Sequence, residues 1–242
     1  MLLSAIITVY NGEKYIERAL KSIFSQSLSK SQYEIIVVND GSTDNTREIL
    51  NRYESEIIVI NQTNHGFVWS KNKGIKHSVG KYIIYVDADD YIDNDLFILT
   101  TDLLEKHKEY DCIYTDRYEV RRDRNDRVIV GKNNIFNMIA CGLLFRKSIF
   151  DEIGLFDDSL LFGDDYDFMI RFFKNNLSAY YLQKPLYYYV KHDSNMTVQK
   201  QCWKDGWNQL LEKWGKDEMR KWFDIQLGTK YEKKDHTYSR NW

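Results

Sequence analysis

The first ninety residues alternate between two patterns of hydrophobic positions. Four short apolar runs are bounded by polar turns, which is typical of strands buried on both faces. These runs are Leu3–Val9, Ile35–Val38, Ile57–Ile60 and Tyr82–Val86. Between them, apolar residues recur three or four positions apart and predict amphipathic helices. The helices are expected at Tyr15–Phe24, Asn45–Tyr53 and Val68–Lys76.

Strands and helices that alternate at this spacing predict right-handed βαβ units. We therefore expect an α/β fold with a mostly parallel central sheet and helices on both faces. In such sheets a ligand binds beyond the carboxyl ends of the strands. Those ends are here Thr8–Asn11, Asn39–Asp44 and Asp87–Asp90, and all three contain short polar side chains.

The second half of the chain is less regular. Helices are expected at Leu96–Lys108 and Asp165–Lys174. Short strands are expected at Cys112–Thr115, Gly142–Phe145, Tyr180–Leu182 and Leu186–Val190. The dense run of mixed charge at Arg117–Arg127 predicts a mobile loop over the site.

The C-terminal segment differs from the rest in its pattern. Large apolar residues lie near helical spacing with lysines between them, at Trp203, Trp207, Leu210, Leu211, Trp214 and Trp222. Such a stripe either packs against the preceding domain or lies at a membrane interface, and packing is the commoner use. We predict an α/β domain at residues 1–200 and a short helical extension at residues 201–242.

Composition restricts the class of protein. The 242 residues are 43% hydrophobic and 29% charged, which allows one large domain with a sizeable core. The net charge of −2 provides no positive potential to attract nucleic acid, so nucleic acid is excluded as a main partner. Cys112, Cys141 and Cys202 are too far apart for a zinc ribbon or a disulfide framework and suit a reducing cytosol. No apolar run approaches the ~20 residues of a membrane span. We expect a cytoplasmic protein, with the C-terminal segment as its candidate contact with the inner membrane face.

Three carboxylates follow the fourth predicted strand, at Asp87, Asp89 and Asp90. Their mutual repulsion is costly unless a cation shares the site. Hard divalent ions prefer such oxygen ligands and accept diphosphate oxygens in the remaining positions. Residues two apart in an extended segment face the same side, so Asp87 and Asp89 can address one metal–diphosphate unit. The alternative is a solvated turn in which Asp90 or Asp93 caps the next helix.

A second acidic run, Gly163–Phe168, precedes a predicted helix. Crowding and partial burial raise the pKa of a carboxyl towards the working range of a general base. A carboxylate at a helix start can equally be an N-cap. His192 is a third candidate, either as a structural hydrogen-bonding residue or as an imidazole ligand of a metal.

Four blocks of sequence, in a defined order, carry a family resemblance. They are Ile6–Glu13, Glu34–Asp44, Asn72–Asp90, and Gly154–Asp157 with Gly163–Phe168. Together they span about residues 4–197 and resemble the family-2 glycosyltransferases, which use nucleotide-sugar donors and have the GT-A fold.

The resemblance implies a nucleotide pocket at the first strand ends. Thr8, Tyr10 and Glu13 are expected to line it. Asp40 is expected to accept a hydrogen bond from the base, typically uracil. Lys71 stands where the family frequently has arginine. Lysine keeps the positive charge but lacks the planar guanidinium group that binds an anion through two hydrogen bonds.

The resemblance also implies the catalytic side of the site. Asp87 is expected to reach the ribose or the metal, Asp89 to be the principal metal ligand, and His192 to lie near the diphosphate or metal. Asp165 is the expected general base. Asp164 replaces the family's common glutamate, so either Asp164 or Asp165 could face the acceptor.

The expected activity is an inverting, metal-dependent glycosyl transfer with Mn²⁺ or Mg²⁺ as cofactor. The donor is expected to be a nucleotide-sugar, typically a UDP-sugar, and the acceptor a saccharide or lipid-linked saccharide in surface polysaccharide synthesis. Two alternatives stay open, a sugar nucleotidyltransferase and a catalytically inactive nucleotide-sugar-binding protein. The segment Asn11–Lys14 lacks the glycine- and arginine-rich loop of the nucleotidyltransferases and the GxGxxG pattern of a dinucleotide-binding dehydrogenase.

Overall fold

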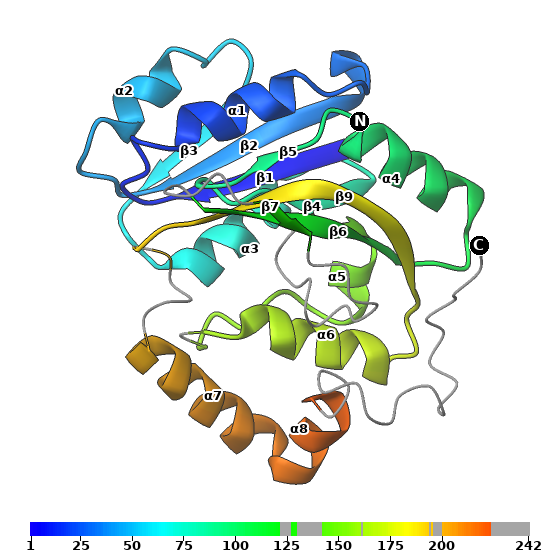
Figure 1. Ribbon diagram of the computed structural model, residues 1–242. Coiled ribbons are helices and arrows are strands. Elements are labelled where there is room, and N and C mark those ends of the chain that lie inside the picture. Colours follow the sequence, from blue (N-terminus) through cyan, green and yellow to red (C-terminus); the bar gives the residue numbers. More distant parts are fainter. Residues whose placement is uncertain (122–126, 130–141, 161, 194, 196–199, 224–242) are drawn as a thin grey trace.

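The computed structural model describes residues 1–121, 127–129, 142–160, 162–193, 195 and 200–223. A nine-stranded sheet lies at its centre, with helices on both faces (Figure 1). The strands are β1 (Leu3–Val9), β2 (Tyr33–Asp40), β3 (Ile58–Gln62), β4 (Tyr82–Tyr85), β5 (Tyr91–Ile92), β6 (Cys112–Arg121), β7 (Arg127–Ile129), β8 (Leu144–Arg146) and β9 (Ala179–Lys191). The helices are α1 (Ile16–Phe24), the 3₁₀ helix η1 (Lys30–Gln32), α2 (Thr46–Asn51), α3 (Phe67–His77), α4 (Leu96–Lys106), α5 (Ile149–Glu152), α6 (Asp164–Lys174), α7 (Lys200–Trp214) and α8 (Lys216–Phe223).

The strand order is β3-β2-β1-β4-β8-β6-β9-β5, and β7 pairs with β6. Strands β3, β2, β1 and β4 pair in parallel, as do β6 and β9. The short strands β8, β5 and β7 run in the opposite direction. The sheet is therefore mostly parallel, and the predicted α/β class is confirmed.

The parallel strands bring three polar segments to one edge of the sheet. Ile6 of β1 lies opposite Ile36 of β2 on one side and opposite Tyr85 of β4 on the other. Beyond the strands, the backbone N–H of Asn11 donates to Ser42 Oγ at 2.9 Å. The predicted ligand-binding edge, built from the ends of β1, β2 and β4, is thus assembled.

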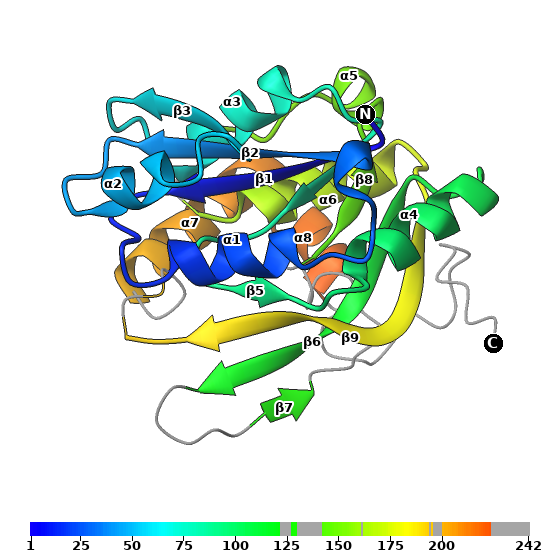
Figure 2. The ribbon, with the colours of Figure 1, turned by 90° about the horizontal axis from the view of Figure 1, so that it is seen from above.

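Two hydrophobic cores cover the two faces of the sheet. Helices α1, α2 and α4 pack on one face, and α3, α5 and α6 pack on the other. Figure 1 shows these layers edge-on, and Figure 2 shows α1 and α4 crossing above the strands. Alternate residues of β1 serve the two cores, Ile6 on the α6 side and Ala5 and Ile7 on the α1 side. Burial on both faces explains the unbroken apolar sequence of this strand.

The prediction of a mobile loop at Arg117–Arg127 is wrong where the structure describes this run. Strand β6 continues through its first five residues and β7 begins at its last, while residues 122–126 lie outside the described residues. A run of charged residues can form a strand when its charges pair with those of the neighbouring strand. Here Oε2 of Glu119 on β6 forms an ion pair with Nζ of Lys191 on β9 at 2.6 Å. The partner strand lies seventy residues further along the chain, so the local pattern could not reveal it.

The two short strands expected at Tyr180–Leu182 and Leu186–Val190 are one strand, β9. Pro185 lies opposite Asp116 of β6, where the register between the strands shifts. Proline has no N–H to donate and is tolerated at such an irregularity. Strands β5 and β7 and helix α5 were not predicted, because elements of two to four residues are too short to show a period.

The C-terminal tryptophans of helices α7 and α8 pack inward. Trp207, Trp214 and Trp222 lie against the core that contains α6, and the ring of Trp222 stacks on Phe173 with centroids 5.7 Å apart. The packing interpretation is confirmed for these three residues. The side chain of Trp203 and residues 224–242 lie outside the described residues. None of the described helices is both long enough and apolar enough to cross a bilayer.

Candidate active site

The acidic turn after β4 is held against the end of β9. Asp90 is fully buried, and its Oδ1 accepts the backbone N–H of Val190 at 2.7 Å. The backbone N–H of Asp87 donates to the hydroxyl of Tyr187 at 3.1 Å. Asp89 Oδ2 accepts a hydrogen bond from His192 Nε2 at 2.8 Å, in the tautomer that is protonated there. The structure thus brings together the two predicted metal ligands, which are 103 residues apart.

Two further residues support this pair and were not predicted. Asn195 Nδ2 donates to Asp89 Oδ2 at 3.1 Å, and Asn195 Oδ1 accepts the backbone N–H of His192. The ring of Tyr15 stacks on His192 with centroids 4.7 Å apart and planes 11° apart. Asparagine two or three residues after a functional histidine is a usable signal for a local turn. No signal in the sequence points to Tyr15, because its partner lies far along the chain.

The second acidic run begins helix α6, as expected. Asp164 Oδ2 accepts the ammonium group of Lys71 at 2.7 Å, and both side chains are more than 90% buried. The ring of Phe156 lies 4.1 Å from Lys71 Nζ and shields the pair from water. Asp165, the next residue, is only partly buried, and its Oδ1 accepts the backbone N–H of Tyr166 at 2.9 Å. The two neighbouring acids therefore have different surroundings.

A cleft lies between the two acidic segments. Its polar lining consists of Lys71, Asp87 and Asp165. Its apolar lining consists of Tyr85, Leu143, Phe145, Phe156, Phe168 and Met169. Convergent charged groups in a mostly apolar cleft are typical of a ligand site.

Both carboxylates of this cavity have strongly perturbed acidity. Burial, reinforced by the charge of Asp164, raises the pKa of Asp165 to about 7, although Lys71 opposes the rise. Burial and the charge of Asp89 raise the pKa of Asp87 to about 7. Burial acts to lower the pKa of Lys71, but the surrounding carboxylates outweigh it and the pKa is raised. Lys71 is therefore a permanent cation beside two acids that titrate near neutrality.

The residues expected in the nucleotide pocket occupy the neighbouring strand ends. Asp40 Oδ1 accepts the backbone N–H of His65 at 2.9 Å, and its Oδ2 accepts that of Gly66 at 2.9 Å. These bonds secure the turn that leads into α3. Thr8 lies opposite Val38 in the register of β1 and β2, and Tyr10 is 53% exposed at the rim.

Two other pocket residues have partners that are now defined. Glu13 accepts both the backbone N–H and the side-chain amide of Asn45, at 3.0 and 2.8 Å. Lys71, expected on the nucleotide side, is engaged with Asp164 at the catalytic acids instead of with Asp40. It nevertheless lines the cavity, so its charge is available to an anionic ligand there.

The donor set around Asp89 suits a divalent cation bound together with a phosphate ligand. Asp89 and His192 offer a carboxylate and an imidazole, and the repulsion between Asp87 and Asp89 would be relieved by a positive charge. Within the described ranges no group of three or more histidine, cysteine, aspartate or glutamate residues is placed to hold a metal. Magnesium in phosphate-handling sites is usually held by one or two carboxylates plus substrate phosphates, and the residues present fit that kind of site.

Comparison with known proteins gives a family match. The model of glycosyl transferase family 2 matches residues 4–156. An uncharacterized glycosyltransferase of Rickettsia prowazekii is 31% identical over 238 residues, covering 90% of this chain and 74% of the relative. The uncharacterized glycosyltransferase EpsJ of Bacillus subtilis is 30% identical over 219 residues, covering 81% of this chain and 63% of EpsJ.

More distant similarity reaches enzymes with named acceptors. A poly(ribitol-phosphate) beta-glucosyltransferase of Bacillus spizizenii is 41% identical over 103 residues, which are 40% of this chain and 16% of that enzyme. The crystal structure of Staphylococcus aureus TarS (residues 1–349) in complex with UDP-GlcNAc superposes with a TM-score of 0.70 at 24% identity. The superposition covers 82% of this chain and 61% of the crystallised TarS chain, and it shows that the two share a fold.

Replacing Lys71 by methionine should destabilise the fold, because Asp164 would be left buried without its cation. Removal of one partner of a buried pair costs about 3–5 kcal/mol. Urea unfolding of Lys71→Met should show this loss. Lys73→Met is the matched control, since Lys73 lies on the same helix over the Trp69 ring and has no carboxylate partner among the described residues. Equal, small losses in both variants would contradict the importance of the pair.

Replacing Asp165 by asparagine should stabilise the protein at alkaline pH. The pKa of Asp165 is raised from 3.8 to about 7, so the native state binds more protons than the unfolded state between these values. The contribution of Asp165 to stability therefore falls as pH rises from about 4 to 7. Asp165→Asn removes this cost, and we expect a gain on the order of 1–2 kcal/mol at pH 8 that vanishes near pH 4. Urea unfolding at both pH values measures it, with the exposed Asp158→Asn as control.

Proposed function

The chain belongs to glycosyl transferase family 2, and on that premise we propose that it transfers a sugar from a UDP-sugar to a hydroxyl of a saccharide or lipid-linked saccharide. The single observation that supports this most is the convergence of Asp165, Asp87 and Lys71 on one cavity. A glycosyl transfer needs a base for the acceptor hydroxyl next to a site for the donor diphosphate. That Asp165 lines the same cavity as Asp87 and Lys71 supports this proposal.

The donor would bind across the ends of β1, β2 and β4. We assign the contact with the nucleobase to Asp40 and the contact with the ribose to Asp87. Thr8, Tyr10 and Glu13 are the proposed residues for the remaining nucleotide contacts. Uracil is the proposed base because the relatives with named donors include TarS, whose structure holds UDP-GlcNAc.

Asp89 and His192 are the proposed ligands of Mn²⁺ or Mg²⁺. When bound, such an ion takes up negative charge on the diphosphate as it leaves. Asn195 and Tyr15 hold the two ligands in place by the hydrogen bonds and ring contact described above. Asp90 holds the turn itself against β9.

Asp165 is the proposed general base. In an inverting transfer the acceptor oxygen attacks the anomeric carbon opposite the diphosphate, the anomeric carbon–oxygen bond to phosphate breaks, and Asp165 takes the acceptor's proton. A pKa near 7 suits this role because the acid is then available as a base at neutral pH and still accepts a proton readily. Asp164 is the poorer candidate, since Lys71 holds it as a buried carboxylate.

The acceptor class follows from the relatives. Enzymes named as poly(ribitol-phosphate) glycosyltransferases match 40–44% of this chain, so we propose an acceptor in a surface polysaccharide or related polymer. We further propose that residues 1–200 form the catalytic domain and 201–242 a helical extension, in a protein that works in the cytoplasm at the inner membrane face. A screen of UDP-, dTDP- and GDP-sugars with Mn²⁺, read as release of nucleoside diphosphate, tests the activity. Release of pyrophosphate from a nucleoside triphosphate and a sugar phosphate would instead indicate a nucleotidyltransferase, and binding without turnover an inactive binding protein.

Asp165→Asn should abolish transfer and leave nucleotide binding nearly unchanged. An asparagine side chain cannot accept the proton, and a positioned base contributes about 10²–10⁴-fold. Turnover with the preferred UDP-sugar and calorimetric titration with UDP measure the two effects separately. Asp158→Asn, at an exposed position before the same helix, should keep wild-type turnover. Turnover of Asp165→Asn close to wild type would remove Asp165 from the role.

Asp89→Ala should weaken UDP binding only when metal is present. The substitution removes the proposed carboxylate ligand, so the Mn²⁺-dependent part of the affinity should be lost. Calorimetric titration of UDP with Mn²⁺ and with EDTA measures it, and Asp102→Ala on the exposed face of α4 is the control. Unchanged affinity with Mn²⁺ would contradict the assignment of Asp89.

A further inference from the structure

Helix α7 packs directly on the turn that leads to the two acids of α6. Gly163, the residue before α6, has φ +83°, and a Cβ built on it would lie 2.7 Å from Cδ1 of Leu210. A Cβ built on Gly206 of α7 would lie 2.5 Å from Cβ of Phe162 and 2.8 Å from its carbonyl oxygen. At Gly206 the backbone of α7 is therefore too close to Phe162 for a larger residue, and at Gly163 the left-handed backbone favours glycine beside the Leu210 side chain.

A buried carboxylate joins the same two helices. Asp167 is fully buried, and its Oδ2 accepts Nε of Arg171 at 2.9 Å. Its Oδ1 accepts Nε1 of Trp214 at 2.9 Å and Nζ of Lys213 at 2.7 Å. Three donors satisfy a charge that would otherwise be costly to bury, and two of the three come from α7.

Lys213 bridges two segments that line the active-site cavity. Besides Asp167, its Nζ lies 2.6 Å from Oδ2 of Asp157. Asp157 follows Phe156, which lines the cavity, and Asp167 is two residues after Asp165, which lines it too. One ammonium group thus ties the C-terminal helix to both walls.

We propose that Lys213 is a positioning residue for glycosyl transfer: through Asp167 and Asp157 it holds the first turn of α6, and with it Asp165, against the cavity. This inference rests on the proposed function. Its consequence is that the C-terminal extension is part of the active-site scaffold. A misplacement of about 1 Å in a reacting group can lower a rate about 100-fold, so a support of this kind affects turnover before it affects binding.

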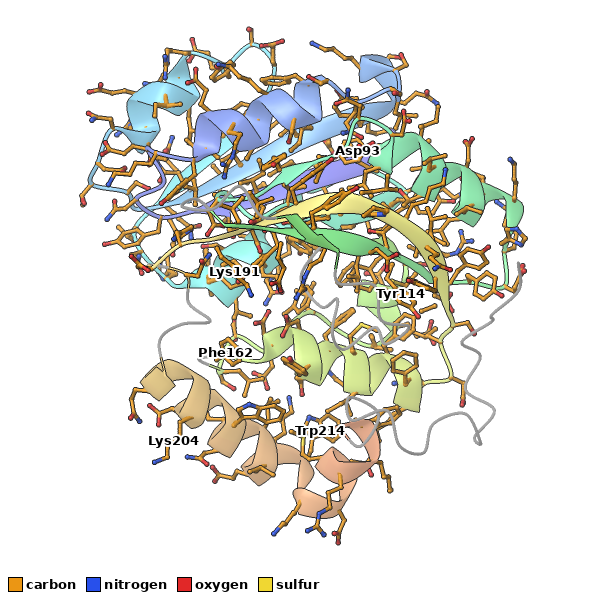
Figure 3. All side chains as sticks on the ribbon, in the orientation of Figure 1. Asp93, Tyr114, Phe162, Lys191, Lys204 and Trp214 are labelled. Carbon is orange, nitrogen blue, oxygen red and sulfur yellow. The ribbon has the colours of Figure 1, made fainter. Side chains whose placement is uncertain are left out.

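The orientation of α7 supplies a matched control. Figure 3 labels Phe162 and Trp214 on the side of α7 that faces α6, and Lys204 on the outer side. Lys204 is exposed. A Lys204→Met variant therefore removes a lysine from the same helix without touching the contacts to Asp157 and Asp167.

The test compares Lys213→Met, Lys213→Arg and Lys204→Met in the full chain. For Lys213→Met we expect kcat to fall about 10- to 100-fold, with KM for the donor and the Kd for UDP with Mn²⁺ within about twofold of wild type. Lys213→Arg should restore most of kcat, because a guanidinium group can bridge the same two carboxylates. Hydrogen exchange of residues 162–168 should become faster in Lys213→Met alone.

Trp214→Phe is the second variant in case Lys213→Met does not fold. It removes one hydrogen bond to Asp167 and keeps a ring, and it should lower kcat in the same direction with unchanged UDP affinity. A kcat equal to that of Lys204→Met, or a loss of kcat matched by an equal loss of UDP affinity, would overturn the proposal. If the wild-type chain transfers no sugar, the proposed function fails, and the exchange measurement still decides this inference: unchanged exchange at 162–168 overturns it.

Discussion

Repulsion among carboxylates is the constraint that organises this structure. Two distant segments bring five acids to one edge of the sheet, and an unpaired buried charge costs several kcal/mol. The five acids are Asp87, Asp89, Asp90, Asp164 and Asp165. Hydrogen-bond donors are distributed unequally among these acids. Lys71 contacts Asp164, and both His192 and Asn195 contact Asp89. In the described part of the chain, Asp87 and Asp165 have no cationic side chain in contact, and these two line the cavity. Among the described residues Asp90 likewise has no cationic side chain in contact, but it is fully buried and does not line the cavity. The cavity therefore exposes two of the acids that have no cationic partner.

Such an arrangement trades stability for reactivity. A carboxyl whose pKa is raised by burial and by a neighbouring charge is destabilising when ionised, and it is also a better base for a hydroxyl proton. Lys71 limits this cost, since without it the charge of Asp164 would raise the pKa of Asp165 still further. The buried ion pair thus distinguishes the two acids: Asp164 is bonded to Lys71, and Asp165 lines the cavity. A sequence with two adjacent aspartates could not distinguish them, and the difference arises only from a lysine 93 residues earlier in the chain.

The parts of the fold that the sequence predicted are those with strong local patterns. Strands β1, β2 and β4 are buried on both faces, so their apolar runs are continuous, and polar residues mark where they end. The acidic turn and the acidic helix start could be recognised for the same reason, because the chemistry is concentrated within four or five residues. For strand β6 the local pattern predicted only the part at Cys112–Thr115 and not the charged residues that continue the strand. Its charged residues find partners on β9, as Glu119 does with Lys191, and a run of charges that is solvated in isolation becomes a stable strand in context.

The C-terminal helices show which kind of information was missing. A stripe of tryptophans with lysines between them has the same pattern whether it covers a protein core or a membrane surface, because both are apolar. Here the two cases are distinguished by a buried carboxylate on another helix, which needs hydrogen-bond donors. Asp167 lies in the first turns of α6 with no exposure to water, so it needs donors, and Trp214 and Lys213 are the donors that α7 brings. A lipid surface offers no such acceptor at a defined position. The direction in which α7 faces is therefore determined by the satisfaction of one buried carboxylate, and the hydrophobic stripe follows that choice.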